Sequence, residues 1–257
     1  MLQHTIDERG VVTLTLDRPQ LHNAFDDALI AELIKVLALY KTHPQSRLLV
    51  LRANGKSFSA GADLNWMQRV AQYTQDQNKD DAENLAELMS SLYYFPHPTL
   101  AVVQGAAFGG GVGLVSCCDI ALASDKASFC LSEVKLGLVP AVISPYVIAA
   151  IGARQAQRYF LSAERFDAQT AYHLGLVQKL CTPETLDNQV TALIDSLLSN
   201  APLALTACKQ LIHRVDAAIN PELRDYTTSL IAQLRVSPEG QEGLAAFLEK
   251  RPAGWLK

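Results

Sequence analysis

Two glycine-rich stretches combine the residue types that could stabilise a negative charge through backbone groups alone. In the first, the apolar run Leu100–Val103 leads through Phe108 into three consecutive glycines at 109–111. In the second, Leu48–Leu51 leads into the small-residue stretch 55–64, GKSFSAGADL. A strand that passes through glycines into a helix leaves free N–H groups at the positive end of the helix dipole. Two such turns could direct one N–H each at a single oxygen, as acyl chemistry needs when a thioester carbonyl becomes an enolate.

Other kinds of site find less support in the sequence. Three glycines also occur where a helix packs closely on a sheet, so the triplet alone does not decide its role. The spacing matches neither the dinucleotide-binding pattern nor the P-loop, which argues against nucleotide binding by those devices. Ser59 and Ser132 do not lie in a G-x-S-x-G turn, so a hydrolase triad is poorly supported. The six histidines and five cysteines have no metal-ligand spacing, and we expect no metal.

The composition is that of an ordinary globular protein with one sizeable core. The chain has 257 residues, of which 49% are hydrophobic and 19% charged, and a formal net charge of -4. This charge argues against a nucleic-acid partner, and the apolar stretches are too interrupted to span a membrane. The polar N-terminus carries no signal, and the cysteines are expected as reduced thiols, so the predicted location is the cytoplasm.

The elements that must position the turns follow a repeated pattern of strand, turn and helix. Strands are predicted at 3–7 and 11–16 as a hairpin, at 48–51, at 100–103, at 127–131 and at 175–177. Helices are predicted from Asp26, over 68–94, 149–160 and 168–174. The chain then becomes almost wholly helical, at 186–199, 202–218, 221–235 and 237–249. The pattern alone does not distinguish a doubly wound sheet from other α/β arrangements.

The motifs FSAGADL at 58–64, AAFGGGVGL at 106–114, CDIALAS at 118–124 and FCLSEVKLGLVP at 129–140 together resemble the crotonase superfamily of enoyl-CoA hydratases and isomerases. The likeness runs from LDRPQLHNAF at 16–25 to SPEGQEGLAAFLEKRPAGW at 237–255. Within that superfamily, GADLNWM, LSEVKLGLVPAVISPYV and RYFLSAERF are most similar to methylglutaconyl-CoA hydratases of leucine and isovalerate catabolism.

The resemblance implies a fold and an assembly. The fold class is α/β, a crotonase-type spiral of stacked ββα units with a C-terminal helical region for trimerisation. The spiral core with the acyl-CoA site would occupy residues 1–195, and the oligomerisation region residues 196–257. The expected assembly is a homotrimer or a dimer of trimers. Coenzyme A would be part of the substrate, and no separate cofactor is expected.

The resemblance also implies site residues. Ala62 and Gly110 carry over as the backbone donors to the thioester oxygen, and Glu133 as the carboxylate that moves protons. A glutamate beside the apolar Val134, Leu136 and Val139 is expected to have a raised pKa. The expected substrate-binding residues are Arg18, Leu21, Ala60, Asp63, Leu64, Trp66 and Gly109, with Phe247 and Lys250 offered to the coenzyme A of a neighbouring subunit.

One position departs from the two-glutamate pattern of hydratases in this superfamily. The second glutamate would stand two positions after the glycine triplet, where this chain has Gly113. Either Glu133 handles both proton and water, or another carboxylate reaches the site. The candidates for that role are Asp80, Asp81, Glu83 and Glu87. The Ala141–Tyr146 run, in place of the family's glycine-rich one, predicts a differently shaped pocket wall.

Three functions therefore stand side by side. The first is hydration of a branched α,β-unsaturated acyl-CoA, with methylglutaconyl-CoA foremost. The second is a Δ3,Δ2-enoyl-CoA isomerase that uses Glu133 as its only base, and the third is an acyl-CoA-binding paralogue without activity. A free carboxylate on the substrate needs a basic partner, for which Arg69, Lys79, Arg158 and Arg165 are the candidates. RNA binding, known for some relatives, is disfavoured by the charge.

Overall fold

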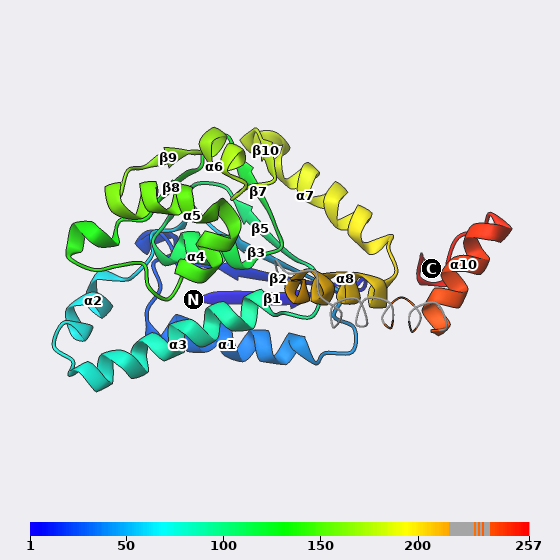
Figure 1. The fold of residues 1–257 in the computed structure, drawn as a ribbon, viewed down its shortest axis with the longest axis horizontal. Helices are drawn as coiled ribbons and strands as arrows, with labels where there is room; N and C mark the ends of the chain where they lie inside the picture. Colours follow the sequence, from blue (N-terminus) through cyan, green and yellow to red (C-terminus); the bar gives the residue numbers. More distant parts are fainter. Residues whose placement is uncertain (216–228, 230, 232, 234–236, 257) are drawn as a thin grey trace.

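A six-stranded sheet runs through the middle of the molecule in the computed structural model, which describes residues 1–215, 229, 231, 233 and 237–256 (Figure 1). Its strands lie in the order β1 (Leu2–Ile6), β2 (Val11–Leu16), β3 (Leu48–Ala53), β5 (Thr99–Val103), β7 (Ile120–Ser124) and β10 (Lys179–Cys181). The β1–β2 pair is the predicted antiparallel hairpin, and every later neighbour in this sheet is parallel.

A smaller, four-stranded sheet runs alongside the first. Its order is β4 (Ser57–Ser59), β6 (Ala106–Phe108), β8 (Ser128–Cys130) and β9 (Phe166–Asp167). The first three strands are parallel to one another, and β9 is antiparallel to β8. Because parallel neighbours start and finish at the same edges of a sheet, β4, β6 and β8 deliver the chain to one common edge.

The chain adds one strand to each sheet in every turn of a spiral. Strands β3 and β4 precede α2 (Leu64–Val70) and α3 (Gln75–Tyr93), strands β5 and β6 precede α4 (Gly110–Cys117), and β7 and β8 precede α5 (Ser144–Ser162). Each unit thus has the form ββα, and the predicted α/β spiral is confirmed.

Helices cover both faces of the large sheet, which explains why its strands are apolar without interruption. Leu49 and Leu51 belong to the larger core with α1 (Asp27–Lys41) and α3, which lie side by side (Figure 1). Leu48 and Val50 point to the opposite face and belong to a second cluster with α7 (Pro183–Leu198).

The helix predicted over 68–94 is wrong as a single element. The chain forms α2 and α3 with a break between them, because Thr74 begins a new helix. Its hydroxyl accepts a hydrogen bond from Gln77 N–H, and the Gln77 side chain accepts one from Thr74 N–H. This reciprocal cap stabilises the start of α3 and sets it apart from α2.

The later part of the chain follows the prediction with one correction. The strand expected at 175–177 lies instead at β10, because Gly175 in the left-handed conformation ends α6 (Ala168–Leu174) and the chain turns before it pairs with β7. Residue 195, the predicted boundary, lies within α7. The helix predicted at 221–235 falls largely outside the described residues, as does the end of the one predicted at 202–218.

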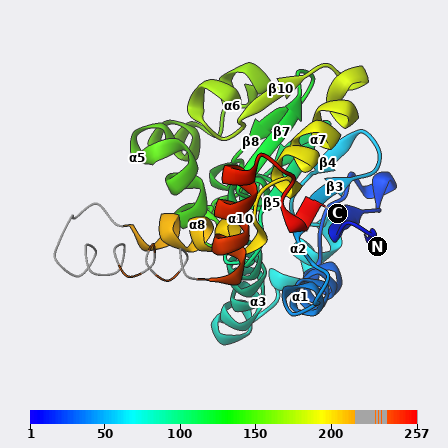
Figure 2. The same cartoon turned by 90° about the vertical axis from the view of Figure 1, so that its right-hand side faces the viewer.

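Two further helices, α8 (Pro202–Arg214) and α10 (Pro238–Glu249), lie together at the end of the molecule that faces the viewer in Figure 2. An ion pair holds α8 to the large sheet. Lys209 Nζ lies 2.8 Å from Asp119 Oδ2, which also accepts hydrogen bonds from Thr99 N–H and Oγ1. The Lys209 side chain is buried. Within the described residues no single helix could cross a membrane, although α7 and α8 together, bent by 100°, pass the same test of length and composition.

Candidate active site

Three candidate groups lie at one edge of the small sheet. The stretch 60–63 follows β4, Gly109 and Gly110 follow β6, and Glu133 comes three residues after β8. Ligands of open parallel sheets bind beyond the carboxyl ends of the strands, which is where these groups stand. The spiral therefore brings together residues that are separated by up to 73 positions in the sequence.

The first two turns are in direct contact with each other. Gly61 has φ +86°, and a Cβ at this residue would lie 2.9 Å from the Phe108 carbonyl oxygen. Only glycine tolerates both this backbone conformation and this approach. Gly111 packs in the same way against β4, since its Cβ would lie 2.8 Å from the Ser59 carbonyl oxygen.

Among the N–H groups of the stretches 60–63 and 109–111, those of Ala62, Gly110 and Gly111 have no hydrogen-bond partner in the part of the chain that the structure describes. Ala62 forms a parallel bridge with Phe25, in which Phe25 N–H donates to Gly61 O and Phe25 O accepts from Asp63 N–H. Ala62's own N–H is therefore directed away from Phe25. Gly110 is the first residue of α4, where the helix dipole favours negative charge.

Glu133 lies against the same glycine turn. A Cβ on Gly109 would be 3.2 Å from Glu133 Oε1, so the carboxylate lies close to the backbone there. Its other oxygen, Oε2, is buried and has no hydrogen-bond partner. Burial raises the pKa of Glu133, and this outweighs the opposing effect of a hydrogen bond from its own backbone. A raised pKa makes this carboxylate a stronger base than an ordinary glutamate, which suits a proton-transfer group.

The raised pKa was predicted, but Leu136 and Val139, two of the three neighbours given as its cause, are not responsible. Leu136 and Val139 are 59% and 68% exposed, so their side chains do not enclose the carboxylate. Glu133 begins a short 3-10 helix (Glu133–Leu136) whose following residues turn outward. It is the position of the carboxylate beside the glycine turn that removes it from water.

No second carboxylate arises from position 113. Gly113 is buried in α4, and a Cβ there would lie 2.4 Å from Ile143 Cγ2 and 3.2 Å from Met89 Cε. Both neighbours are buried, so apolar groups occupy the space into which a side chain at 113 would extend. The Ala141–Tyr146 run, predicted as an altered pocket wall, supplies Ile143.

The other acidic candidates are engaged elsewhere or face solvent. Asp81 accepts a hydrogen bond of 3.1 Å from Trp66 Nε1–H, and burial raises its pKa. Glu83 forms an exposed ion pair with Lys79, Glu87 accepts from Ser91 Oγ, and Asp80 is exposed. Nowhere in the described ranges do three or more His, Cys, Asp or Glu side chains gather in a group that could hold a metal ion.

Arg18 and Asp63, both predicted to contact substrate, contact each other in this structure, and their roles toward a substrate stay predictions. The Arg18 guanidinium lies 2.8 Å from Asp26 and 3.5 Å from Asp63, and all three side chains are largely buried. Asp26 caps α1 and Asp63 caps α2. Burial raises the pKa of Asp26, but hydrogen bonds from Leu29 N–H and Arg18 lower it more, so the net pKa is below its ordinary value.

The remaining predicted substrate contacts are spread around this edge and beyond it. Leu21, Ala60 and Leu64 are exposed near the first turn. Trp66 is a buried core residue beside Phe25. Lys250 is exposed at the end of α10, and the Phe247 side chain lies outside the described part of the molecule. Their roles toward coenzyme A stay predictions.

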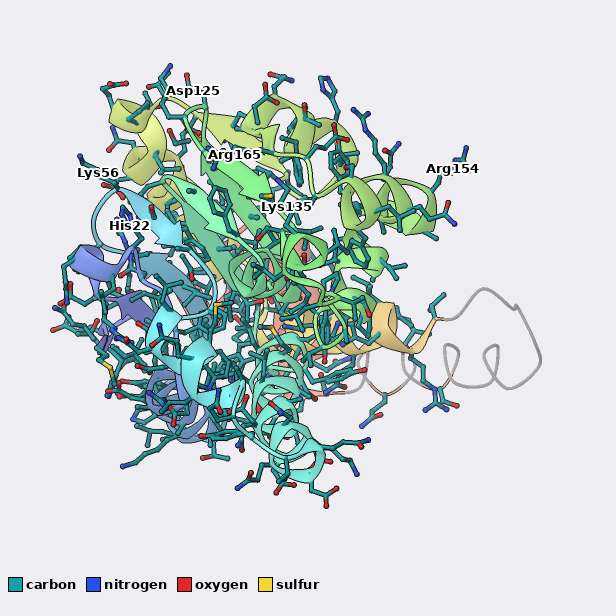
Figure 3. The ribbon with its side chains drawn as sticks, turned by 90° about the vertical axis from the view of Figure 1, so that its left-hand side faces the viewer. His22, Lys56, Asp125, Lys135, Arg154 and Arg165 are labelled. Carbon is teal, nitrogen blue, oxygen red and sulfur yellow. The ribbon has the colours of Figure 1, made fainter. Side chains whose placement is uncertain are left out.

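A face of the molecule carries several basic side chains, labelled together with Asp125 in Figure 3. His22 and Lys56 lie on one side of it, Arg165 and Lys135 near its middle, and Arg154 farther out. In the described structure none of these side chains pairs with a carboxylate. Lys56 comes directly before β4, at the end of that strand opposite to the 60–63 stretch, and Lys135 follows Glu133 by two residues in the chain. Sequence motifs did not single out either one.

Phe25 and Ile143 are two further residues that the sequence did not indicate for the site. Phe25 contacts both glycine turns, and Ile143 fills the space beside Gly113. Their roles depend on contacts between distant segments, which composition and periodicity do not show. The only local signal is that Phe25 ends the motif LHNAF just before α1.

Comparison with known proteins agrees with this geometry. The model of the enoyl-CoA hydratase/isomerase family matches residues 7–257. An enoyl-CoA hydratase structure from Shewanella pealeana has 52% identity and a TM-score of 0.95, covering 99% of this chain and 95% of that one. The 2,3-dehydroadipyl-CoA hydratase of Escherichia coli is 32% identical over 95% of this chain and 94% of its own. The trans-2-decenoyl-[acyl-carrier-protein] isomerase of Streptococcus mutans is 30% identical with the same coverages, 95% and 94%. The chain therefore belongs to the enoyl-CoA hydratase/isomerase family of the crotonase superfamily.

Proposed function

We propose that this protein adds water to an α,β-unsaturated acyl-CoA, with branched 3-methylglutaconyl-CoA as the foremost substrate. The observation that carries the proposal is the Glu133 carboxylate, which lies against Gly109 with one buried oxygen unpartnered. A proton-transfer group next to two free N–H groups is the combination that enolate chemistry requires.

One carboxylate suffices for the proposed addition. The N–H groups of Ala62 and Gly110 stabilise the thioester oxygen as it gains negative charge. Glu133 accepts a proton from water while the water oxygen bonds to Cβ and the C=C π electrons move toward the thioester. The enolate then takes that same proton from Glu133 at Cα. The carboxylate is regenerated, and the product carries one hydroxyl and one added hydrogen.

Coenzyme A is proposed as part of the substrate, with no separate cofactor. Its phosphates are assigned to Lys56 and Lys135, which lie on the face shown in Figure 3 and form no ion pair within the described structure, while Leu21, Ala60 and Leu64 offer exposed apolar contacts. The roles of Phe247 and Lys250 toward a neighbour's coenzyme A, the trimer or dimer of trimers, the cytoplasmic location and the place in leucine catabolism are further parts of this proposal.

The free carboxylate of a methylglutaconyl group is assigned to Arg165. Three of the four candidate cations are already paired: Arg69 with Asp27, Lys79 with Glu83 and Arg158 with Glu164. Arg165 instead stacks on Phe108, the residue before Gly109, with its guanidinium carbon 4.7 Å from the ring centre. Arg165→Gln should raise KM for 3-methylglutaconyl-CoA about tenfold and leave crotonyl-CoA unchanged. Equal increases for both would assign Arg165 to coenzyme A instead.

An isomerase is the alternative that a specific observation favours. Ile143 and Met89 fill the space beside Gly113, so only Glu133 is left to act as a base at this turn. A single base could move a proton between Cα and Cγ of an enoyl thioester, and one relative is named as an isomerase. An acyl-CoA-binding protein without activity is the third possibility.

An absorbance assay separates the three. Purified protein and its Glu133→Gln variant are given 3-methylglutaconyl-CoA, crotonyl-CoA and a trans-3-enoyl-CoA. Loss of conjugated enoyl absorbance with the branched substrate, abolished in the variant, supports the hydratase. Gain of absorbance from the 3-enoyl substrate alone supports the isomerase. Binding of the esters by calorimetry without any absorbance change would leave the non-catalytic function.

A further inference from the structure

Phe25 lies between the two glycine-rich turns and contacts both. Its ring is 1% exposed, and a Cβ on Gly110 would lie 2.2 Å from the ring atom Cζ. Its main chain pairs with the other turn, donating to Gly61 O at 2.8 Å and accepting from Asp63 N–H at 3.0 Å. One residue therefore touches Gly110 through its side chain and the 61–63 stretch through its backbone.

These two contacts fix different properties of the donor pair. The backbone of Phe25 bonds to Gly61 O and to Asp63 N–H, the groups before and after Ala62. The Ala62 N–H therefore points away from Phe25. The ring limits how closely the first turn of α4 can approach the 61–63 stretch. Phe25 therefore adds to the direct contacts of Gly61 with Phe108 and of Gly111 with Ser59 in fixing the separation of the Ala62 and Gly110 N–H groups.

The ring is itself held from the other side. The Trp66 ring lies 6.5 Å from it, centre to centre, at an angle of 50°. Trp66 is buried in α2 and donates its indole N–H to Asp81 in α3. Phe25 is thus packed between Trp66 of α2 and the start of α4.

We infer that Phe25 is a positioning residue that sets the separation of the two N–H donors, and thereby how strongly the protein polarises a bound thioester carbonyl. The inference rests on the proposed function, which gives those donors their oxygen. Phe25 acts through Ala62 and Gly110 and does not itself contact the reacting atoms. Small misplacements of preorganised donors reduce rate far more than they reduce binding.

The test compares Phe25→Leu with Phe95→Leu, another fully buried phenylalanine of the same core. The readouts are kcat and KM for crotonyl-CoA, and the red shift of 4-dimethylaminocinnamoyl-CoA absorbance on binding, which reports carbonyl polarisation. Phe25→Leu should lower kcat about 10–100-fold, change KM less than about threefold, and reduce the red shift. Phe95→Leu should lower the unfolding temperature and preserve both kcat and the shift.

A second variant covers the case in which Phe25→Leu does not fold. Phe25→Tyr keeps the ring and adds an oxygen to Cζ, the atom that faces Gly110, so it should push the donors apart and also lower kcat and the shift. The inference is overturned if a folded Phe25 variant keeps wild-type kcat and red shift. If the wild type itself gives neither turnover nor a shift, the proposed function fails, and the inference fails with it.

Discussion

The side chain of Ile143 occupies the space in which a side chain at Gly113 would begin, with its Cγ2 2.4 Å from the Cβ position. We expect Gly113→Ala to lower the free energy of unfolding by about 1–3 kcal/mol, because the added methyl overpacks a filled core. Urea unfolding of Gly113→Ala, Ile143→Ala and the double variant measures this contact. The loss of unfolding free energy in the double variant should be smaller than the sum of the losses in the two single variants, by about 0.5–3 kcal/mol. Strict additivity would show that the two residues do not compete for space.

The buried position of Glu133 predicts the acid limb of the rate profile. Hydration needs the ionised carboxylate, and burial raises its pKa, so kcat/KM should fall at a pH above the ordinary glutamate value of about 4.3. The measurement is kcat/KM for crotonyl-CoA between acidic and neutral pH. Asp81→Asn is the control, because the Asp81 pKa is also raised by burial but its carboxylate binds Trp66. If Asp81→Asn shifted the pH at which kcat/KM falls, the assignment of that fall to Glu133 would be contradicted.

The same burial predicts that Glu133 reduces stability. A carboxyl group whose pKa is raised in the folded state disfavours folding once it ionises, above its unfolded pKa. Glu133→Gln should therefore unfold at an equal temperature or one higher by about 1–4 °C at neutral pH. The difference should vanish as the pH falls below the unfolded pKa. Glu83→Gln, on the exposed surface, is the matched control, and a lower midpoint for Glu133→Gln would contradict the argument.

Arg18 offers a direct test between a structural and a substrate-binding role. Arg18→Met leaves the buried Asp26 and Asp63 carboxylates without their cation, and should cost about 3–5 kcal/mol of unfolding free energy. KM for acyl-CoA esters should change little in the protein that remains folded. Arg69→Met, which removes an exposed arginine paired with Asp27, should hardly change the unfolding midpoint. Normal stability together with a much higher KM would restore Arg18 as a coenzyme A contact.

The Lys209–Asp119 pair predicts unequal effects of its two partners. Asp119→Ala removes the acceptor of Lys209 and of both Thr99 donors, leaving a buried ammonium whose remaining contact is His97 O at 3.3 Å. Lys209→Met leaves Asp119 its hydrogen bonds to Thr99. Asp119→Ala should lower the free energy of unfolding in urea by about 3–5 kcal/mol, and Lys209→Met should lower it distinctly less. An equal or reversed order would contradict the argument that the unpaired Lys209 ammonium is the larger cost.

Local patterns predicted most of the described helices, because apolar periodicity and turn residues act over a few positions. They also predicted the strands β1, β2, β3, β5 and β8, but not β4, β6, β7 or β9. They failed at 175–177, where apolar residues form a turn before β10, and at Thr74, where a cap divides a polar helix. The order of the strands came from the resemblance, since periodicity does not reveal which strands pair.

The candidate site was predictable where a motif is contiguous and not where contacts join distant segments. The turns at 60–63 and 109–111 could be found as glycine-rich stretches after strands. The pairing of Arg18 with Asp63, 45 positions later, and the filling of the Gly113 space by Ile143 could not. These contacts depend on how successive turns of the spiral stack.

The order β4, β6, β8 in the small sheet has a consequence for how the chemistry of such a protein can change. The stretch 60–63, the glycine turn 109–111 and Glu133 each follow a different strand of this sheet. A side-chain substitution after one strand leaves the backbone pairing of the other strands intact. A new reaction could therefore arise by replacing one residue, for example the glutamate at 133. The backbone N–H groups of the other two stretches would keep their positions.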